Sequence, residues 1–302
     1  MFEYRSRPRI VTEAYLLAGL RGSPHINQIV GQYVHNEDIY IVMELFGLLI
    51  TNEMREAPEI HHGTEPGEME VSLGLSPPTG EDFIIDTTRE KRSLLSENDV
   101  CKVVSHLLAG LLYAKGRGVI HSDICHRNYL VDKDLNAQLI DFGTSALCLE
   151  ERDFERGYAF IQQVENVILP EAINPNNLEV RNGTKFDIRE GDVWRLGVLT
   201  FELLGGCPPW QDQNEKDWQR YVVDQGWIYP EETKARRARI LEFPVPVYER
   251  LSEDCKDALR AMLATNPAER VTLEELATLP WFSGWFVDSD HVFRKPDTSA
   301  EG

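Results

Sequence analysis

The sequence has little that would carry the chain into or across a membrane. Its most apolar run, residues 39–50, is interrupted by Glu44 and is shorter than the roughly 20 residues that span a bilayer. The first residues, Met1 to Arg5, place no apolar stretch behind a basic end, so we expect no secretory signal. The sequence therefore predicts no membrane span.

Cysteine is scarce and widely spaced, and basic charge is in deficit. Five cysteines occur among 302 residues, none in a C-x-x-C pair, and an odd number cannot all pair among themselves. We therefore expect a reducing compartment, cytoplasmic or nuclear. The formal net charge of −19 disfavours polyanions, so no nucleic-acid partner is expected. A hydrophobic content of 42% is enough for a sizeable core.

The first ninety residues combine a helix pattern, a hairpin pattern and an acidic segment. Apolar residues at helical spacing predict a helix over 11–20, ended by a Gly-Ser-Pro turn. Two β-branched and aromatic segments, 28–34 and 39–46, predict a β-hairpin. Residues 51–92 hold ten acidic and four basic residues with poor periodicity, so we expect an exposed, mobile insertion.

The rest of the chain is mainly helical in pattern. Ser96 and Asp99 resemble a capping box that begins a helix ending at Lys115. A broad apolar stripe on that helix consists of Val100, Val103, Val104, Leu107, Leu108, Leu111 and Leu112. Short strands are predicted at 128–131 and 137–140. Further helices are predicted at 191–204, 215–224, 231–242, 252–263 and 272–277, and the tail after Asp288 is expected to fray.

Polar residues suited to catalysis stand at both ends of the two predicted strands that follow residue 127. A hairpin of this length brings its ends to one site, so Asp123, Asn128 and Asp141 should converge on one loop rim. Phosphoryl transfer from a Mg²⁺-nucleotide needs such a set. One carboxylate orients the attacking hydroxyl and accepts its proton, while a second carboxylate and an amide oxygen hold magnesium, which prefers oxygen ligands.

The stretches His121–Asn128 and Asp141–Gly143 resemble the H-R-D-x-x-x-x-N and D-F-G motifs of the eukaryotic protein-kinase family. The resemblance implies that Asp123 is the catalytic base and that Asn128 and Asp141 are the metal ligands. Arg127 stands where tyrosine kinases carry an arginine and would add positive charge near the γ-phosphate. One residue does not decide acceptor type, and Ser/Thr is favoured over Tyr.

Further motifs follow in the order that the family shows them. Leu169-Pro170-Glu171 resembles A-P-E, and the stretch from Gly191 resembles the start of a central buried helix. In all, the resemblance covers residues from about 10 to 285. It assigns structural roles to six residues. Asp192 would tether the catalytic-loop backbone, and His121 and Phe142 would belong to the buried column that joins the lobes. Glu171 and Arg270 would form an ion pair, and Gly143 would complete the D-F-G motif.

The resemblance also implies a nucleotide site. Glu13 matches the glutamate of the small-lobe helix, and Met43 and Glu44, followed by Leu45, fall at the gatekeeper and hinge. Leu130 would pack beneath the adenine ring. ATP and Mg²⁺ are the implied cofactors, and a protein substrate or protein partner is the implied macromolecule.

The sequence departs from the family pattern before Glu13. The family places a glycine-rich loop and a strand-borne lysine there, whereas this sequence has no glycine before Gly19 and no lysine before Lys91. Ser122 replaces the arginine that reads a phosphorylated activation loop. Two interpretations stay open: a truncated product or incomplete gene model of an active kinase, and a degenerate pseudokinase that acts as a binding or regulatory module.

These observations predict an α+β, bilobal protein-kinase-like fold with a truncated small lobe and a mainly helical large lobe. The expected division is a partial small lobe over 1–47, hinge and acidic insertion over 48–95, large lobe over 96–286 and flexible tail over 287–302. A small-molecule kinase of the aminoglycoside type, whose loop also reads H-x-D-x-x-x-x-N, is a weaker alternative. The A-P-E-like segment, Asp192 and Arg270 argue against it.

Overall fold

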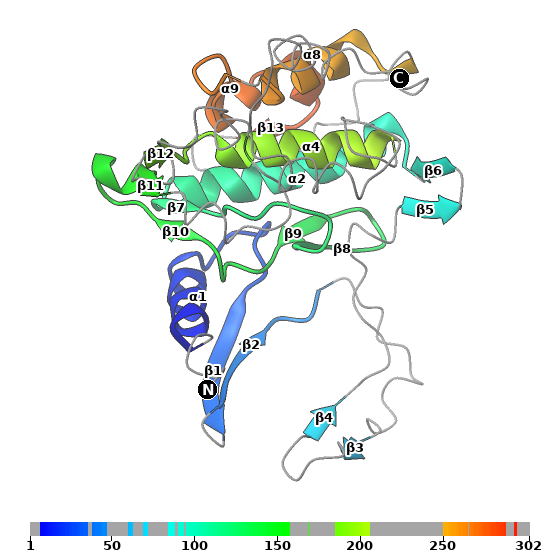
Figure 1. Cartoon of the computed structure of the whole chain (residues 1–302). Coiled ribbons are helices and arrows are strands. Elements are labelled where there is room, and N and C mark those ends of the chain that lie inside the picture. Colours follow the sequence, from blue (N-terminus) through cyan, green and yellow to red (C-terminus); the bar gives the residue numbers. More distant parts are fainter. Residues whose placement is uncertain are drawn as a thin grey trace, which may run out of the picture.

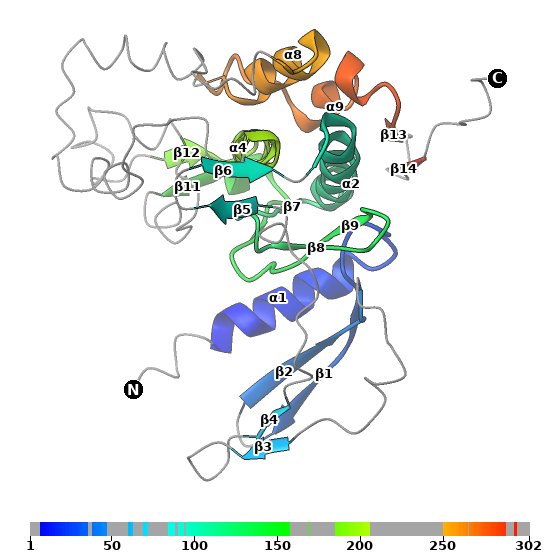
Figure 2. The same cartoon turned by 90° about the vertical axis from the view of Figure 1, so that its right-hand side faces the viewer.

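The computed structural model has two lobes with short strands between them. It describes residues 7–35, 38–46, 60–62, 69–71, 84–87, 90–93, 95–157, 169, 185–205, 250–264, 266–287 and 293–294. Figures 1 and 2 show one helix and a two-stranded ribbon on one side of the molecule and the other α-helices gathered on the opposite side.

The smaller lobe consists of α1 (Arg7–Gly19), β1 (Ile29–His35) and β2 (Asp38–Met43). The strands form the predicted antiparallel hairpin, with Tyr33 opposite Tyr40 and their rings stacked at 4.8 Å. The helix packs against both strands and begins four residues before the predicted range.

The larger lobe is built around two buried helices. The α-helices among its described residues are α2 (Glu97–Lys115), α4 (Gly191–Gly205), α8 (Glu253–Met262) and α9 (Leu273–Leu276). The capping box of Ser96 and Asp99 is present, and all seven residues of the predicted α2 stripe are buried. α4 packs between α2 and α8, and a Cβ built on Gly197 would lie 2.7 Å from Met262 Cβ. Glycine at position 197 therefore allows α4 and α8 to approach each other closely.

Short antiparallel pairs complete the described structure. They are β7 (Val119–Ile120) with β10 (Ala146–Leu147), β8 (Tyr129–Val131) with β9 (Ala137–Leu139), β11 (Glu155–Gly157) with β12 (Lys185–Asp187), and β13 (Phe286–Val287) with β14 (Phe293–Arg294). Single 3₁₀ turns occur at Glu151–Phe154 and Pro280–Phe282.

Two hairpins lie within the segment that the sequence marks as an insertion. β3 (Ile60–His62) pairs with β4 (Met69–Val71), and β5 (Ile84–Thr87) pairs with β6 (Glu90–Ser93). The sequence analysis missed both, because backbone pairing of short neighbouring segments needs no apolar alternation. The predicted helices over 215–224 and 231–242 lie outside the described residues, as does most of the tail. Within the described part of the chain, no helix has the length and apolarity needed to cross a membrane.

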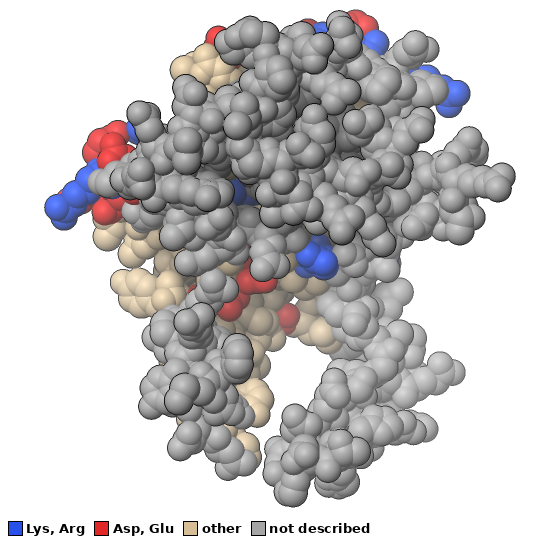
Figure 3. Space-filling model, in the orientation of Figure 1, with Lys and Arg blue, Asp and Glu red and all other residues tan. Residues whose placement is uncertain are grey.

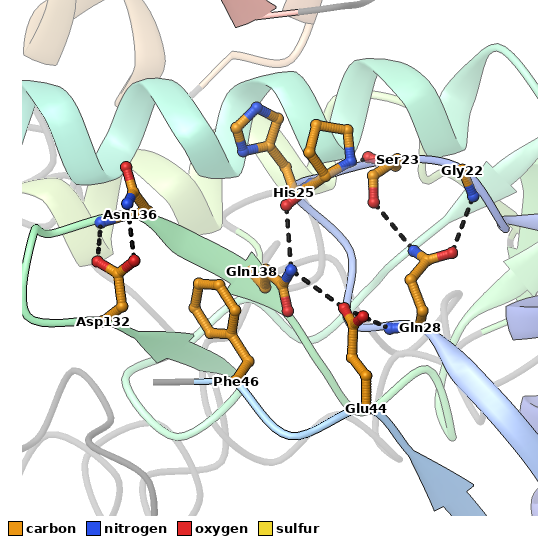
Figure 4. A pocket seen from close by; sticks show the side chains of 10 residues that line it. Gly22, Ser23, His25, Gln28, Glu44, Phe46, Asp132, Asn136 and Gln138 are labelled. Atoms are coloured by element: carbon orange, nitrogen blue, oxygen red, sulfur yellow. Dashed lines mark hydrogen bonds between the residues drawn. The ribbon is translucent and has the colours of Figure 1, made fainter. Parts of the chain in front are cut away.

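The lobes are joined through the segment that follows α1. Ile26 forms a parallel bridge with Leu139 of β9, where Leu139 N donates to His25 O at 2.9 Å and Asn27 N donates to Leu139 O at 3.0 Å. A pocket of about 500 Å³ lies beside this joint, shown in Figure 4. Its lining residues are Gly22, Ser23, Pro24, His25, Gln28, Glu44, Phe46, Asp132, Asn136 and Gln138.

Candidate active site

The loop that follows β7 is tied to the start of α4. His121 N and Ser122 N donate to the two carboxylate oxygens of Asp192, each at 2.8 Å. All three residues are buried, and Ser122 has a φ of 72°, in the left-handed region that non-glycine residues seldom adopt. The two hydrogen bonds hold a backbone turn that would otherwise be unfavourable.

The rings of His121 and Phe142 pack against each other in the space between the lobes. Their centroids are 4.6 Å apart and both residues are fully buried. His121 Nε2 lies 3.0 Å from Ile140 O, and Ser145 Oγ donates to His121 O at 3.0 Å. The contacts fix the loop that starts at His121 against the segment that contains Asp141 to Gly143.

Asp123 and Asn128 are hydrogen-bonded to each other in the same loop. Asn128 Nδ2 donates to Asp123 Oδ2 at 2.9 Å and to Asp123 O at 2.8 Å, and both residues are buried. No described residue donates to Asn128 Oδ1. The amide group thus directs its N–H bonds at Asp123 and leaves its oxygen as an acceptor for another group.

Asp141 stands beside this pair at the other end of the β8–β9 hairpin. Ile140 N donates to Asn128 O at 3.0 Å, so the residue before Asp141 is bonded directly to Asn128. Asp141 is exposed, has a φ of 60°, and accepts from Gly143 N at 3.2 Å. The structure therefore gathers Asp123, Asn128 and Asp141 at one rim, as the hairpin spacing predicts.

Glu13 reaches the same rim from α1. It is half-buried and accepts a hydrogen bond from the backbone N–H of Phe142. Burial raises the pKa of the Glu13 carboxyl, and the negative charge of Asp141 raises it further. Figure 3 shows acidic side chains at the centre of the face between the lobes, with basic groups nearby.

The residues between Asp123 and Asn128 have different surroundings. Arg127 is exposed, whereas Cys125 is buried, and burial raises the pKa of the Cys125 thiol to about 11. Cys125 is therefore a thiol at neutral pH and a poor nucleophile. His126 Nε2 lies 2.7 Å from Glu202 Oε2 of α4, a second contact between this loop and that helix. The sequence analysis missed the pair, since no local pattern places Glu202 near the loop.

The hinge residues differ in what they offer to a ligand. Glu44 N donates to Gln28 O at 2.9 Å, and Glu44 O accepts from Asn27 Nδ2 at 3.3 Å. The Glu44 N–H is therefore already used within the protein, and the Glu44 carbonyl keeps one lone pair that could serve an adenine ring. Met43 packs partly against the core, Leu45 is 57% exposed, and Leu130 of β8 is buried.

Arg270 lies far from this rim and is buried. Its Nε donates to Ala264 O at 3.0 Å and its Nη1 to Glu190 O at 3.1 Å, with the guanidinium carbon 5.2 Å from the centroid of the Trp194 ring. Glu171, the partner that the resemblance implies, lies outside the described residues, so the ion pair stays a prediction.

The chemistry of the rim fits magnesium bound together with a nucleotide. Among the described residues, no three His, Cys, Asp or Glu side chains are grouped to hold a metal by themselves. Magnesium usually takes only one or two carboxylates from a protein and fills its other positions with water and substrate phosphates. An exposed Asp141 carboxylate and the Asn128 oxygen are donors of that kind.

Comparisons with known proteins agree with this arrangement. A family model described as protein kinase domain matches residues 70–282. Calcium-dependent protein kinase 22 of Arabidopsis thaliana is 29% identical over 276 residues, which cover 90% of this chain and 45% of that protein. The cell cycle serine/threonine-protein kinase CDC5/MSD2 of Saccharomyces cerevisiae is 30% identical over 200 residues, 66% of this chain and 25% of that protein.

CBL-interacting protein kinase 10 of Oryza sativa subsp. japonica is 31% identical over 192 residues, 64% of this chain and 37% of that protein. The matched part of this chain thus spans between a quarter and less than half of the length of these relatives. The family match covers most of the chain and includes the loop that holds Asp123, Asn128 and Asp141. This chain belongs to the protein kinase family.

Proposed function

We propose that this chain transfers the γ-phosphate of ATP to serine or threonine hydroxyls of proteins. The observation that carries the proposal is the assembly of Asp123, Asn128 and Asp141 at one rim, held by hydrogen bonds from Asn128 to Asp123 and from Ile140 to Asn128. The names of the related proteins, several of them serine/threonine-protein kinases, support this choice of acceptor.

Each residue of the rim has a role in the proposal. The Asp123 carboxylate orients the acceptor hydroxyl and takes its proton. Asn128 Oδ1 and Asp141 hold Mg²⁺, which when bound offsets the charge on the phosphate oxygens. Arg127, exposed four residues after Asp123, adds positive charge on the acceptor side. Leu130 packs under the adenine ring, and Met43, Glu44 and Leu45 border it.

The finer proposal concerns how the phosphates are held. Magnesium held by Asn128 Oδ1 and Asp141 would bind the phosphate oxygens from the side of the β8–β9 hairpin. Protein hydroxyls remain the proposed acceptors, and the cytoplasm or nucleus the proposed location.

A binding module without transferase activity is the second candidate. The observation that favours it is the surroundings of Glu13, which faces Asp141 and forms no ion pair with a basic residue among those described. Electrostatic positioning supplies most of the catalysis of phosphoryl transfer, so in this candidate Glu13 without a cationic partner would lower the rate. In this candidate Asp123, Asn128 and Asp141 have a structural role, with or without a bound nucleotide, and no phosphate is transferred.

A thermal-shift titration separates the two candidates. We expect millimolar Mg²⁺-ATP to raise the melting temperature of the purified chain by mass action, and Asp141→Asn to remove most of that shift. A shift together with phosphate incorporation into Ser/Thr peptides supports the kinase. A shift without incorporation supports the binding module. The absence of both a shift and incorporation contradicts nucleotide-dependent function for this chain.

A further inference from the structure

We propose that the pocket beside the joint between the lobes is a docking site for an arginine side chain carried by a peptide segment of a partner protein. The pocket, shown in Figure 4, lies between the segment after α1, the residues that follow β2 and the turn of the β8–β9 hairpin. Its volume of about 500 Å³ is within the range of about 300–1,000 Å³ that is typical of ligand pockets. Asp123, Asn128 and Asp141 are not among its lining residues, so docking here does not depend on phosphate transfer.

The charged side chains that line this pocket are acidic. Glu44 and Asp132 are both partly buried, and none of the described lining residues is a lysine or an arginine. Neither acid forms an ion pair with a described basic residue. Burial lowers the pKa of His25, another lining residue, to about 4, so its imidazole is neutral at pH 7. The pocket therefore attracts a cation.

The side-chain amides that line the pocket use N–H groups within the protein. Gln138 is buried, and its Nε2 donates to a backbone carbonyl oxygen and to Glu44 Oε1, both at 3.2 Å. Gln28 Nε2 donates to two backbone carbonyl oxygens of the segment after α1. Asn136 Nδ2 donates to Asp132 Oδ2 at 2.7 Å. A ligand would therefore find most of these donors already occupied.

Acceptor oxygens around the pocket, by contrast, have capacity left. Glu44 Oε1 accepts from Gln28 N and Gln138 Nε2, whereas no described residue donates to Glu44 Oε2. Asn136 Oδ1 likewise receives no hydrogen bond from the described part of the chain, and Asp132 Oδ2 accepts only one there. Oxygens with unused lone pairs, beside donors that are already engaged, fit a ligand group that has donors only.

Among protein side chains, arginine matches this chemistry best. Its guanidinium has five N–H donors in a planar fork and no acceptor, and it stacks on aromatic rings. Figure 4 shows Phe46 in the part of the pocket between Asp132 and Glu44, so a guanidinium on the Phe46 ring would direct N–H groups toward both carboxylates. Gly22 and Pro24 at the pocket are exposed, which leaves room for the residues that flank the arginine in a peptide.

The test follows peptide binding to the isotope-labelled full chain by NMR. The probe is acetyl-Ala-Leu-Arg-Leu-Ala-amide, and the control peptide carries citrulline, a neutral group of the same shape, in place of arginine. We expect the arginine peptide to shift the backbone amide signals of Gly22 and Asn136. It should bind about tenfold or more tightly than the citrulline peptide, because hydrogen bonds between charged groups are the stronger kind.

Single substitutions locate the binding. Glu44→Gln and Asp132→Asn each keep a side-chain acceptor but lose the charge, and each should weaken binding of the arginine peptide by about tenfold. The melting temperature of each variant checks that it is folded. Glu274→Gln and Asp257→Asn remove the same charges from exposed positions on α9 and α8 and should leave binding unchanged.

Several results would overturn docking at this place. They are equal affinity for the two peptides, signal shifts only outside the pocket, unchanged affinity in both pocket variants, and a wild-type chain that binds neither peptide at millimolar concentration. The chain's own basic residues are the rival occupant. If the arginine peptide binds only after Arg236, Arg237 and Arg239 are changed to glutamine, the pocket holds this chain's own segment, and docking of a partner is contradicted.

Discussion

The side-chain amide of Asn128 donates to the Asp123 carboxylate at 2.9 Å and to the Asp123 carbonyl oxygen at 2.8 Å. The residue proposed to orient the acceptor hydroxyl is thus positioned by the residue proposed to hold magnesium. A change at either residue is felt by the other, because both are buried in one short loop.

The first prediction concerns this pair. Asn128→Ala removes both donors from Asp123 and leaves a buried carboxylate and carbonyl with fewer hydrogen bonds. We expect a loss of about 1–3 kcal/mol in the free energy of unfolding, measured by urea denaturation. Asn136→Ala, which breaks a more exposed contact to Asp132, should cost less. Equal losses in the two variants would contradict the account.

A second prediction concerns the tie between the loop and α4. Asp192→Ala leaves the buried N–H groups of His121 and Ser122 without their acceptors, at about 1–3 kcal/mol for each. Asp192→Asn keeps one acceptor oxygen and should be intermediate. Hydrogen exchange at the two amides should accelerate in the order wild type, Asp192→Asn, Asp192→Ala. Unchanged exchange in Asp192→Ala would show that these bonds do not hold the loop.

Helix packing provides a third prediction. A Cβ on Gly197 would lie 2.7 Å from Met262 Cβ and 3.0 Å from Leu263 Cδ2, so Gly197→Ala should lower the free energy of unfolding by about 1–3 kcal/mol. A Cβ on Gly19 meets nothing within 4 Å, and Gly19→Ala should be neutral or slightly stabilising. A neutral Gly197→Ala in urea denaturation would disprove the close approach of α4 and α8.

The stacked rings of His25 and His106 predict a dependence of stability on pH. Burial lowers the pKa of His25 to about 4; burial and then the neighbouring His25 lower that of His106 to about 3, whereas the unfolded chain titrates near 6.5. The unfolded state therefore binds more protons below pH 6.5. The two neutral histidines therefore make their full contribution to the free energy of unfolding above that pH. As the pH falls to 5, the free energy of unfolding decreases by about 2 kcal/mol per histidine.

Chemical denaturation between pH 7.5 and 5 measures this dependence. In the wild type the Ala137 N–H donates to His106 Nδ1. His106→Asn keeps an acceptor for this N–H, but the asparagine side chain does not titrate. We expect its unfolding free energy to fall less steeply toward pH 5 than that of the wild type. A variant that parallels the wild type over the whole range would contradict the assignment, since carboxylate titration is common to both proteins.

Local patterns allowed part of this structure to be predicted. The capping box at Ser96 and the α2 stripe follow from helical periodicity, and the ends of the β8–β9 hairpin follow from its length. Contacts between segments that are far apart in the sequence leave no local sequence pattern from which they could be predicted. The His126–Glu202 pair depends on where α4 lies, and the partners of the Glu44 backbone depend on how the segment after α1 meets the hinge.

The backbone at the rim was also beyond prediction from local pattern. Ser122 and Asp141 have positive φ values. Ser122, whose residue type seldom adopts such a φ, is held by a hydrogen bond to Asp192 of α4, whereas Asp141 accepts a local hydrogen bond from Gly143. Both residues lie in the site. At Ser122 a tertiary hydrogen bond, which local propensity does not report, therefore holds the backbone geometry of the loop that contains Asp123.

The most direct measurement is transfer of labelled γ-phosphate from Mg²⁺-ATP to protein by the purified chain and by Asp123→Asn. Asparagine keeps the shape of Asp123 but accepts no proton, so the account predicts incorporation by the wild type that falls by about 10²–10⁴-fold in the variant, with similar melting temperatures. No incorporation above background by the wild type, or equal incorporation by both proteins, would contradict a phosphotransferase role for this rim.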